Sequence, residues 1–140
     1  MEKIRINTHG GPMPEKHGDW YDLCTAEDAW VMPHYITNIS LGVSMELPKG
    51  SYAMVVPRSS TPKNWGILLA NGVGIIDNDY CGDGDVWRFP AICLDNREQV
   101  HIPKGTRIAQ FTIFHTKEFT LEQVDALGNK DRGGFGSTGK

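Results

Sequence analysis

An alternation of apolar and polar residues over positions 39–47 restricts the possible folds of this chain more than any other feature of its sequence. The apolar members are Ile39, Leu41, Val43, Met45 and Leu47. The positions between them carry Ser, Gly, Ser and Glu, and a Pro-Lys-Gly turn follows. A period of two places every apolar side chain on one face of a β-strand. Residues 39–47 are therefore expected to form one half-buried strand that ends in a turn.

The same period of two recurs in shorter segments elsewhere in the chain. It covers residues 52–56 and 87–93, and briefer versions occur at Ile4/Ile6, Val100/Ile102 and Phe111/Ile113. The 16 glycines and 8 prolines are scattered between these segments, as expected where turns join many short elements. No stretch of ten or more residues keeps a helical period cleanly. The sequence thus predicts an all-β fold, a jelly-roll-like barrel or sandwich.

At most one short helix is expected. Ser60 or Thr61 can cap its N-terminus, and Pro62 suits its first turn. A chain of 140 residues has the length of one domain. The β domain is expected to span residues 1–127, and the glycine-rich residues 128–140 are expected to form an arm that buries almost nothing.

Charge and cysteine usage narrow the range of partners. The net charge is −3 and the sequence pI is about 5.9, which provides no basic surface for polymeric nucleic acid or for a membrane. No apolar run approaches the roughly 18 residues that cross a bilayer, and no signal peptide is recognisable, so a cytosolic location is expected. The three cysteines, Cys24, Cys81 and Cys93, are odd in number and widely spaced. A disulfide framework is therefore not expected.

Two short segments in the middle of the chain stand out, and the first of them suits phosphate chemistry. Pro57-Arg58-Ser59-Ser60 places a guanidinium and two hydroxyls just before the expected helix, where free N–H groups favour an anion such as phosphate. An ordinary serine cap beside a surface arginine is the alternative interpretation. The second segment, Arg107-Ile108-Ala109-Gln110, alternates polar and apolar residues, and Gln110 by itself is typical of a strand.

A third segment runs from Asn71 to Tyr80. Its glycines predict a hairpin whose backbone can approach a ligand closely. Asp77 and Tyr80 would point to opposite faces of a regular strand, but a turn or bulge at Asn78 would bring them together. A solvated turn is the alternative interpretation.

The glycine-rich C-terminal segment also has two interpretations. One is a frayed tail. The other is an arm that orders over a ligand, because glycines let backbone N–H groups converge on phosphate oxygens while Arg132 and Phe135 supply charge and a stacking face. Residues 134–140 fit the spacing of a P-loop, but no strand leads into them and no helix follows, so a P-loop is rejected.

Taken together and in this order, five segments resemble the five motifs of the trimeric dUTPase family and extend over nearly the whole chain. The first is Tyr21-Asp22-Leu23, preceded by Trp20 where the family usually has Gly, and the second is Pro57-Arg58-Ser59-Ser60. The third covers residues 74–80, the fourth 105–110 and the fifth 132–139. A compact chain of this kind is similar to bacterial, prophage and phage members.

The resemblance implies a jelly-roll fold of the dUTPase type, a homotrimer with shared active sites, and Mg²⁺-dependent hydrolysis of dUTP to dUMP and pyrophosphate. This reaction limits uracil incorporation into DNA and supplies dUMP for thymidylate synthesis. In the implied mechanism, Asp77 activates the water that attacks the α-phosphorus. Ser59 donates to the leaving oxygen, and Arg58, Gln110 and Arg132 stabilise charge on the phosphates.

The resemblance also assigns the remaining site residues. Asp22 is implied to support either the water shell of Mg²⁺ or the network around the phosphates, and the ion keeps mostly water and phosphate oxygens as ligands. The segment from Asn71 to Ile76 is implied to pair with the uracil edge, and Tyr80 to pack under the deoxyribose. The other implied substrate contacts are Ser60, Gly74, Phe135 stacked on the base, Gly136, and Ser137 and Thr138 at the γ-phosphate. The arm is implied to close over the site.

Two other functions remain open on the sequence alone. A dCTP deaminase shares the fold, but that family relies on a Glu near the base, and residues 74–80 contain none. A regulatory protein that keeps the nucleotide pocket and contacts a partner is the second. Complete motifs and the absence of a long insertion between them favour the hydrolase.

The segment after Tyr80 departs from the family pattern. Residues 81–90 are more acidic and more aromatic than is common there. Trp87 and Phe89 have two possible roles: both are core residues of a strand, or one helps to cover the nucleotide.

Overall fold

The computed structural model describes residues 2–94, 98–134 and 136, and these residues form short strands and one short helix. The predicted all-β class is therefore confirmed. The elements are β1 (Arg5–Asn7), β2 (Glu15–His17), β3 (Trp20–Cys24), β4 (Ala29–Val31), β5 (Thr37–Ser40), β6 (Ser44–Glu46), β7 (Ser51–Pro57), α1 (Thr61–Trp65), β8 (Ile67–Leu69), β9 (Gly74–Ile76), β10 (Arg88–Cys93), β11 (Val100–Ile102) and β12 (Arg107–His115).

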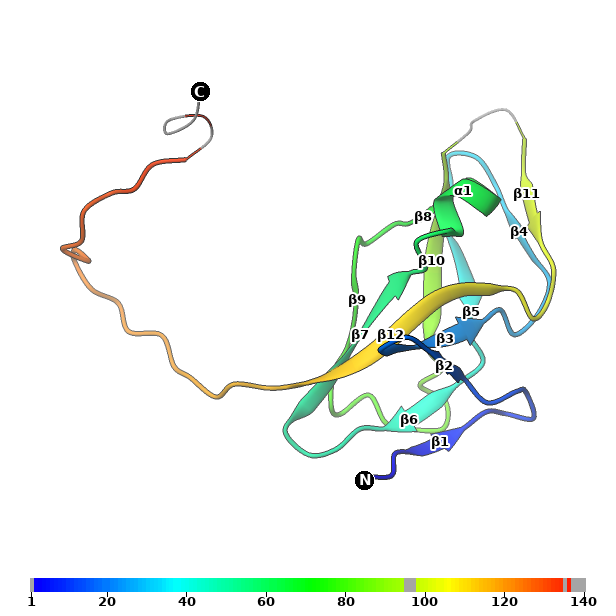
Figure 1. Cartoon of the computed structure of the whole chain (residues 1–140), viewed down its shortest axis with the longest axis horizontal. Coiled ribbons are helices and arrows are strands. Elements are labelled where there is room, and N and C mark those ends of the chain that lie inside the picture. Colours follow the sequence, from blue (N-terminus) through cyan, green and yellow to red (C-terminus); the bar gives the residue numbers. More distant parts are fainter. Residues whose placement is uncertain (1, 95–97, 135, 137–140) are drawn as a thin grey trace.

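The strands form a five-stranded sheet, a three-stranded sheet and two strand pairs (Figure 1). The five-stranded sheet has the order β2-β3-β12-β7-β9, so that β12 lies between β3 and β7. The three-stranded sheet has the order β5-β10-β8, and the pairs are β1-β6 and β4-β11. All of these ladders are antiparallel, as in a jelly-roll-like sandwich.

The core lies between the two larger sheets. Phe111 of β12 meets the ring of Trp87 edge to face, with 5.1 Å between the ring centroids. Trp87 and Phe89 are both 0% exposed. They are therefore core residues, which decides between the two roles considered for them. Other fully buried members of the core include Val31, Ala53, Ile67, Ala91, Ile102 and Ile108.

The predicted single strand over residues 39–47 is wrong in one respect. All five of its apolar side chains are buried, as the alternation indicated, but the backbone is divided between β5 and β6. Gly42 lies between these strands with φ +71, a conformation that side-chain-bearing residues rarely adopt. On one side of Gly42, the N–H of Leu41 donates to the carbonyl of Trp87 at 2.9 Å. On the other side, the carbonyl of Val43 accepts from the N–H of Trp87 at 2.8 Å. The chain therefore passes from one sheet to another at Gly42.

The single helix begins and ends near the predicted signals. Ser60 is the N-cap residue, although its hydroxyl makes no capping hydrogen bond, and Pro62 lies in the first turn. Gly66 ends the helix in the left-handed conformation, with φ +64. The hydroxyl of buried Thr61 donates to the carbonyl of Ile108 at 2.7 Å, which ties the start of α1 to β12.

The predicted hairpin around residues 71–76 is wrong, because its flanking strands do not pair with each other. β8 pairs with β10 in the three-stranded sheet, whereas β9 pairs with β7 in the five-stranded sheet. Residues 70–73 are instead a tight turn that links two sheets. Gly74 packs closely against Val55, because an added Cβ would lie 3.3 Å from the Val55 Cβ, a tight contact.

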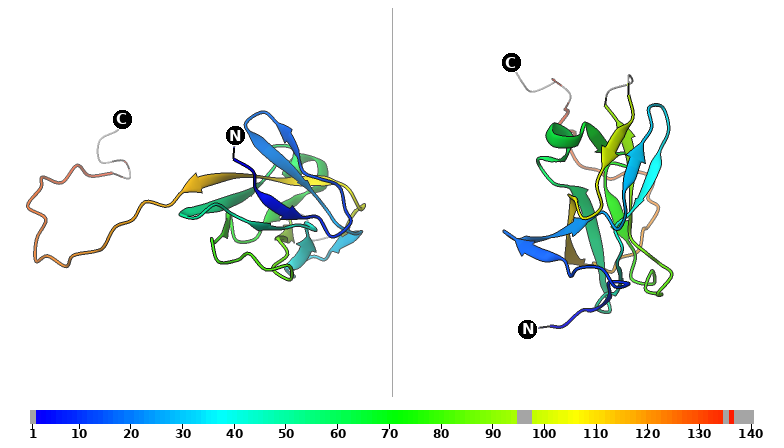
Figure 2. Two further views of the ribbon diagram at one scale, coloured as in Figure 1. Left: turned by 90° about the horizontal axis from the view of Figure 1, so that it is seen from below. Right: turned by 90° about the vertical axis from the view of Figure 1, so that its right-hand side faces the viewer.

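Residues 116–134 follow β12 without a helix or strand and extend away from the sheets (Figures 1 and 2). Their side chains include the exposed Phe119, Leu121 and Leu127. The predicted boundary between residues 127 and 128, and the closure of an arm, stay predictions. Within the described ranges, no helix has the length and apolar character needed to cross a membrane.

Candidate active site

A buried carboxylate on β3 balances two guanidinium groups. Asp22 is only 4% exposed, and its Oδ2 lies 3.4 Å from Nε of Arg58 and 3.6 Å from Nη1 of Arg107. The two arginines come from different elements, because Arg58 follows β7 and Arg107 begins β12. β12 pairs with β3 on one side and with β7 on the other, which is why residues far apart in sequence meet here.

Arg58 makes two further contacts, one through its backbone and one through its guanidinium. Its backbone N–H donates to the carbonyl of Ile108, and its Nη1 donates to the carbonyl of Arg107, each at 3.3 Å. Its side chain remains 30% exposed. A guanidinium that is oriented by a buried carboxylate and still reaches solvent is well placed to receive an anion.

Gln110 and the two serines lie beside this guanidinium. Gln110 of β12 is paired in register with Asp22 on one side and Val56 on the other, and its Nε2 donates to the carbonyl of Pro57 at 3.2 Å. Ser59 is exposed and Ser60 is half-buried, immediately before α1. We call Asp22, Arg58, Ser59, Ser60, Arg107 and Gln110 the phosphate-side group.

Arg107 was not assigned a role from the sequence, although it lies in the fourth segment. In a regular strand, residues 107 and 110 would point to opposite faces because they are three apart. The ladder between β12 and β3 is irregular between Arg107 and Ala109, and the additional residue brings Arg107 to the face of Asp22. An unpaired bulge residue leaves no clear mark in an alternating sequence.

A second set of predicted residues surrounds β9. Asn71 lies in the turn before this strand, where its Nδ2 donates to the carbonyl of Val73 at 3.3 Å. Gly74 and Ile76 are the first and last residues of β9, and Asp77 and Tyr80 follow it, both exposed. We call these five residues the nucleoside-side group.

The predicted turn at Asn78 is present. The N–H of Tyr80 donates to the carbonyl of Asp77 at 3.1 Å, which closes the turn. The side chain of Asn78 donates to the carbonyls of Pro48 and Ser51, at 2.6 and 2.9 Å. The exposed Asp77 carboxylate therefore projects from a turn whose backbone is anchored to the start of β7.

Within one chain, Asp77 and Arg58 lie toward opposite ends of β7. Ile76, just before Asp77, pairs with Ala53, whereas Arg58 lies five residues further along the same strand direction. Five residues of strand span about 16 Å. One chain therefore does not place the Asp77 carboxylate next to the Arg58 guanidinium.

Comparison with known proteins identifies the family. The family model described as dUTPase matches residues 13–139 of this chain. The chain belongs to the dUTPase family.

Individual members of the family show the same likeness. The SPbeta prophage-derived deoxyuridine 5'-triphosphate nucleotidohydrolase of Bacillus subtilis is 50% identical over 125 residues, which cover 89% of this chain and 86% of that protein. The structure of the Staphylococcus bacteriophage 80alpha dUTPase with dUPNHPP superposes with a TM-score of 0.80 at 21% identity and full coverage of both chains. The dUTPase of phage phi11 of S. aureus, a mutant whose structure shows a structural Mg(II) ion, gives a TM-score of 0.74 at 18% identity. That superposition covers 90% of this chain and 99% of the phage chain.

The fifth motif of the dUTPase family is only partly described. Arg132 follows the segment that extends from β12, and its Nε donates to the carbonyl of Gly133 at 3.2 Å. Gly136 is the last described residue. Phe135, Ser137 and Thr138 lie outside the described residues. In the single chain, Arg132 is therefore not placed beside either group.

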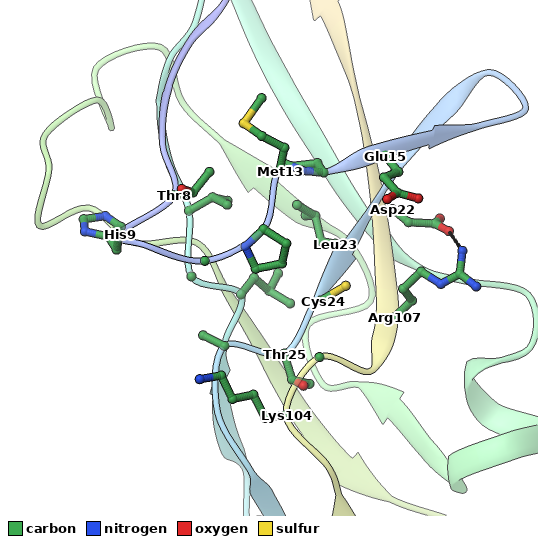
Figure 3. A pocket seen from close by; sticks show the side chains of 18 of the residues that line it. Thr8, His9, Met13, Glu15, Asp22, Leu23, Cys24, Thr25, Lys104 and Arg107 are labelled. Carbon is green, nitrogen blue, oxygen red and sulfur yellow. Dashed lines mark ion pairs between the residues drawn. The ribbon is translucent and has the colours of Figure 1, made fainter.

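A cavity of about 410 Å³ lies behind the first dUTPase motif (Figure 3). It is bounded by the loop of residues 8–14, by β3 and by Lys104, and Asp22 and Arg107 are at its edge. Arg58 and Asp77 do not line it, so we do not identify it with the nucleotide site. Cys24 also lines it, and burial raises the pKa of this thiol despite the opposing charge of Arg107.

The described residues contain no cluster of three or more His, Cys, Asp or Glu side chains that could hold a metal ion. A site built only from protein ligands is therefore absent from this part of the chain. Asp22 Oδ2 is nevertheless buried and accepts no hydrogen bond from the described residues. This oxygen faces the guanidinium groups of Arg58 and Arg107, so the described residues suit Mg²⁺ where phosphate oxygens and water supply most of its ligands.

Proposed function

We propose that this chain hydrolyses dUTP to dUMP and pyrophosphate. The observation that carries the proposal is the oriented guanidinium of Arg58, held between buried Asp22 and the backbone of β12 and still accessible to an anion. Membership of the dUTPase family and the 50% identity to a deoxyuridine 5'-triphosphate nucleotidohydrolase give this anion its chemical identity.

The phosphate-side group binds and polarises the triphosphate in this proposal. A guanidinium carries five N–H donors; that of Arg58 makes one hydrogen bond, to the carbonyl of Arg107, and its Nε lies 3.4 Å from Asp22 Oδ2 in an ion pair. The remaining donors are available for phosphate oxygens, beside the amide of Gln110. Ser59 donates to the oxygen that leaves with pyrophosphate.

Asp77 acts as the general base. Its carboxylate accepts a proton from water while the water oxygen bonds to the α-phosphorus. The bond from the α-phosphorus to the bridging oxygen breaks, and its electron pair leaves on pyrophosphate. The exposure of Asp77 and the anchoring of its turn by Asn78 support this role, since a base needs access to water and a fixed position.

The turn between β8 and β9 selects the base, and Tyr80 after β9 selects the sugar. The backbone from Asn71 to Ile76, including Gly74, pairs with the edge of uracil, and close packing there rejects a 5-methyl group. Tyr80 packs under the deoxyribose, where a 2′-hydroxyl would collide. The rigid attachment of β9 to β7 supports this, because a selective surface has to resist displacement.

Active sites shared between the chains of a homotrimer are part of the proposal. The separation of about 16 Å between Asp77 and Arg58 within one chain supports it, because both groups have to act on the same phosphate chain. The arm closes over a site of the trimer. Its contacts come from Arg132, Phe135, Gly136, Ser137 and Thr138, with Ser60 on the body.

The residues present fit an Mg²⁺ ion bound through the substrate. Asp22 would support its water shell, and the ion would neutralise charge on the triphosphate. The structural Mg(II) ion of the phage phi11 dUTPase supports the presence of the metal in related proteins. A cytosolic location belongs to the same proposal.

The proposal is tested by incubating the protein with Mg²⁺ and, separately, dUTP, dCTP, UTP and dTTP, and measuring nucleotide products, pyrophosphate and ammonia. We expect conversion of dUTP alone, and loss of turnover in Asp77→Asn with dUTP still bound. Release of ammonia from dCTP would instead identify a deaminase. Binding of dUTP without turnover by the unmodified protein would favour a regulatory protein.

A further inference from the structure

Asn7 links the N-terminal strand to the acidic loop that follows Tyr80. Its Nδ2 donates to Oδ1 of Asp83 at 2.8 Å. The backbone N–H of His9 donates to Oδ1 of Asn7 at 2.9 Å, which determines the end of the amide that faces Asp83. The loop is therefore tied to a segment that is more than 70 residues away in sequence.

The side chain of Ser44 holds the backbone of Asp83. Its Oγ donates to the carbonyl of Asp83 at 3.3 Å and lies 2.9 Å from Nε2 of His9. Ser44 is only 3% exposed, and it faces Asn7 directly in the β1-β6 ladder. We call Asn7, His9, Ser44 and Asp83 the loop clamp. Both the side chain and the backbone of Asp83 are held by residues that face each other across this one ladder.

The acidic loop runs from Tyr80, whose phenol is its first side chain, to Trp87 in the core. The N–H of Gly82 donates to Oδ2 of Asp85 at 2.9 Å, which closes a tight turn around Asp83. At the end of the loop, the N–H of buried Trp87 donates to the carbonyl of Val43 at 2.8 Å. The hydroxyl of Tyr80 donates to the carbonyl of Val86 at 3.4 Å. The position of the phenol thus depends on a loop that is fixed at Asp83 and at Trp87.

We propose that the loop clamp positions Tyr80 and thereby determines how strongly the site rejects a ribonucleotide. The proposal rests on the proposed function, in which Tyr80 packs under the deoxyribose. Asn7 and His9 precede residue 13, where the family match begins, so the clamp is not accounted for by family membership. The carbonyl of Val86 belongs to the same planar peptide unit as the N–H of Trp87, which the carbonyl of Val43 holds in place. Release of Asp83 would therefore free the residues between Tyr80 and this fixed point, let the phenol move away from the Val86 carbonyl, and make room for a 2′-hydroxyl.

The test measures kcat/KM for dUTP and for UTP on the same preparation, with enough enzyme to follow slow UTP turnover. The ratio of the two values is independent of the fraction of folded enzyme, so a purely structural defect does not change it. Asn7→Asp places a carboxylate against Asp83 and removes the donor. We expect this variant to lower the preference for dUTP over UTP by about three- to tenfold.

Reversal of the donor and the acceptor provides the matched rescue. Asp83→Asn alone keeps an acceptor oxygen for the Asn7 amide, and we expect a nearly unchanged ratio. The double variant Asn7→Asp/Asp83→Asn places the donor on the loop and the acceptor on β1, and it is expected to restore the preference. Glu46→Gln is the control on the same ladder, because it removes only the exposed ion pair with Arg5.

The outcomes separate this proposal from the proposed function. An unmodified protein that prefers dUTP, together with an unchanged ratio in Asn7→Asp, overturns the loop clamp and leaves the hydrolase intact. A fall in the ratio that also occurs in Glu46→Gln, or that the double variant does not reverse, overturns it as well. An unmodified protein without dUTP turnover overturns the proposed function, and the loop clamp with it.

Discussion

At the scale of single residues, Asp22 decides the electrostatics of the phosphate-side group. Its carboxylate is almost completely buried, and the two positive groups within 4 Å compensate for the loss of hydration. Each of the two arginines remains partly exposed, with side-chain exposures of 30% for Arg58 and 44% for Arg107. The buried charge therefore orients two solvent-accessible cations, which is the arrangement that a phosphate-binding surface requires.

We expect Asp22→Asn to raise the KM for dUTP by roughly tenfold, with a smaller change in kcat, because the neutral amide no longer orients the Arg58 guanidinium. Steady-state kinetics at saturating Mg²⁺ measures both constants. Glu15→Gln is the control, since Glu15 is the exposed carboxylate that lies opposite Asp22 in the β2-β3 ladder. Equal KM values for the unmodified protein and Asp22→Asn would contradict the assigned role.

Single residues also show where prediction from sequence ends. Asp22, Arg58 and Gln110 were identified as site residues because they match family motifs, and the structure brings them together. Arg107 was not identified, since its direction depends on an irregularity in the β12-β3 ladder. A bulge is decided by the pairing of two strands, and one strand's sequence does not contain that information.

At the scale of elements, the alternation over residues 39–47 predicted burial correctly and strand continuity incorrectly. The inward-facing side chains follow from the period of two, which the core enforces. The break at Gly42 depends on tertiary contacts, because an added Cβ there would lie 2.9 Å from the Cβ of Ala26. The prediction of a hairpin between β8 and β9 is wrong for a similar reason. β8 pairs with β10 and β9 pairs with β7, and the sequence does not show these partners.

Gly42→Ala is expected to destabilise the fold by roughly 2–3 kcal/mol, because it combines a left-handed backbone with a steric clash. Gly50→Ala is the matched control. Gly50 has a similar φ of +75, but nothing lies within 4 Å of its added Cβ, so this variant is expected to lose only about 1 kcal/mol. Urea unfolding of both variants measures the difference. Equal losses would show that the contact with Ala26 contributes nothing.

At the scale of the whole molecule, the predicted base Asp77 and the predicted phosphate ligand Arg58 lie apart in one chain. The phosphate-side group is fixed around β3, β12 and the end of β7, and the nucleoside-side group is fixed around β9. The residues after β12 extend from the sheets (Figure 2). Their exposed side chains include Phe119, Leu121 and Leu127. Several exposed apolar side chains on one segment are typical of a surface that contacts another protein. The sequence motifs predict the parts of the site, but their order along the chain does not show which parts come from the same chain.

Mixing two inactive variants measures whether one site uses two chains. Asp77→Asn removes the proposed base and Arg58→Ala removes the guanidinium proposed to bind phosphate, and each variant alone is expected to be nearly inactive. If Asp77 and Arg58 of one site come from different chains of a cyclic trimer, a mixed trimer contains sites in which both residues are intact. After co-refolding at equal concentrations, one site in four is intact, so about a quarter of the unmodified turnover should return. Sites contained within one chain would give no recovery, because every chain in the mixture lacks one of the two groups.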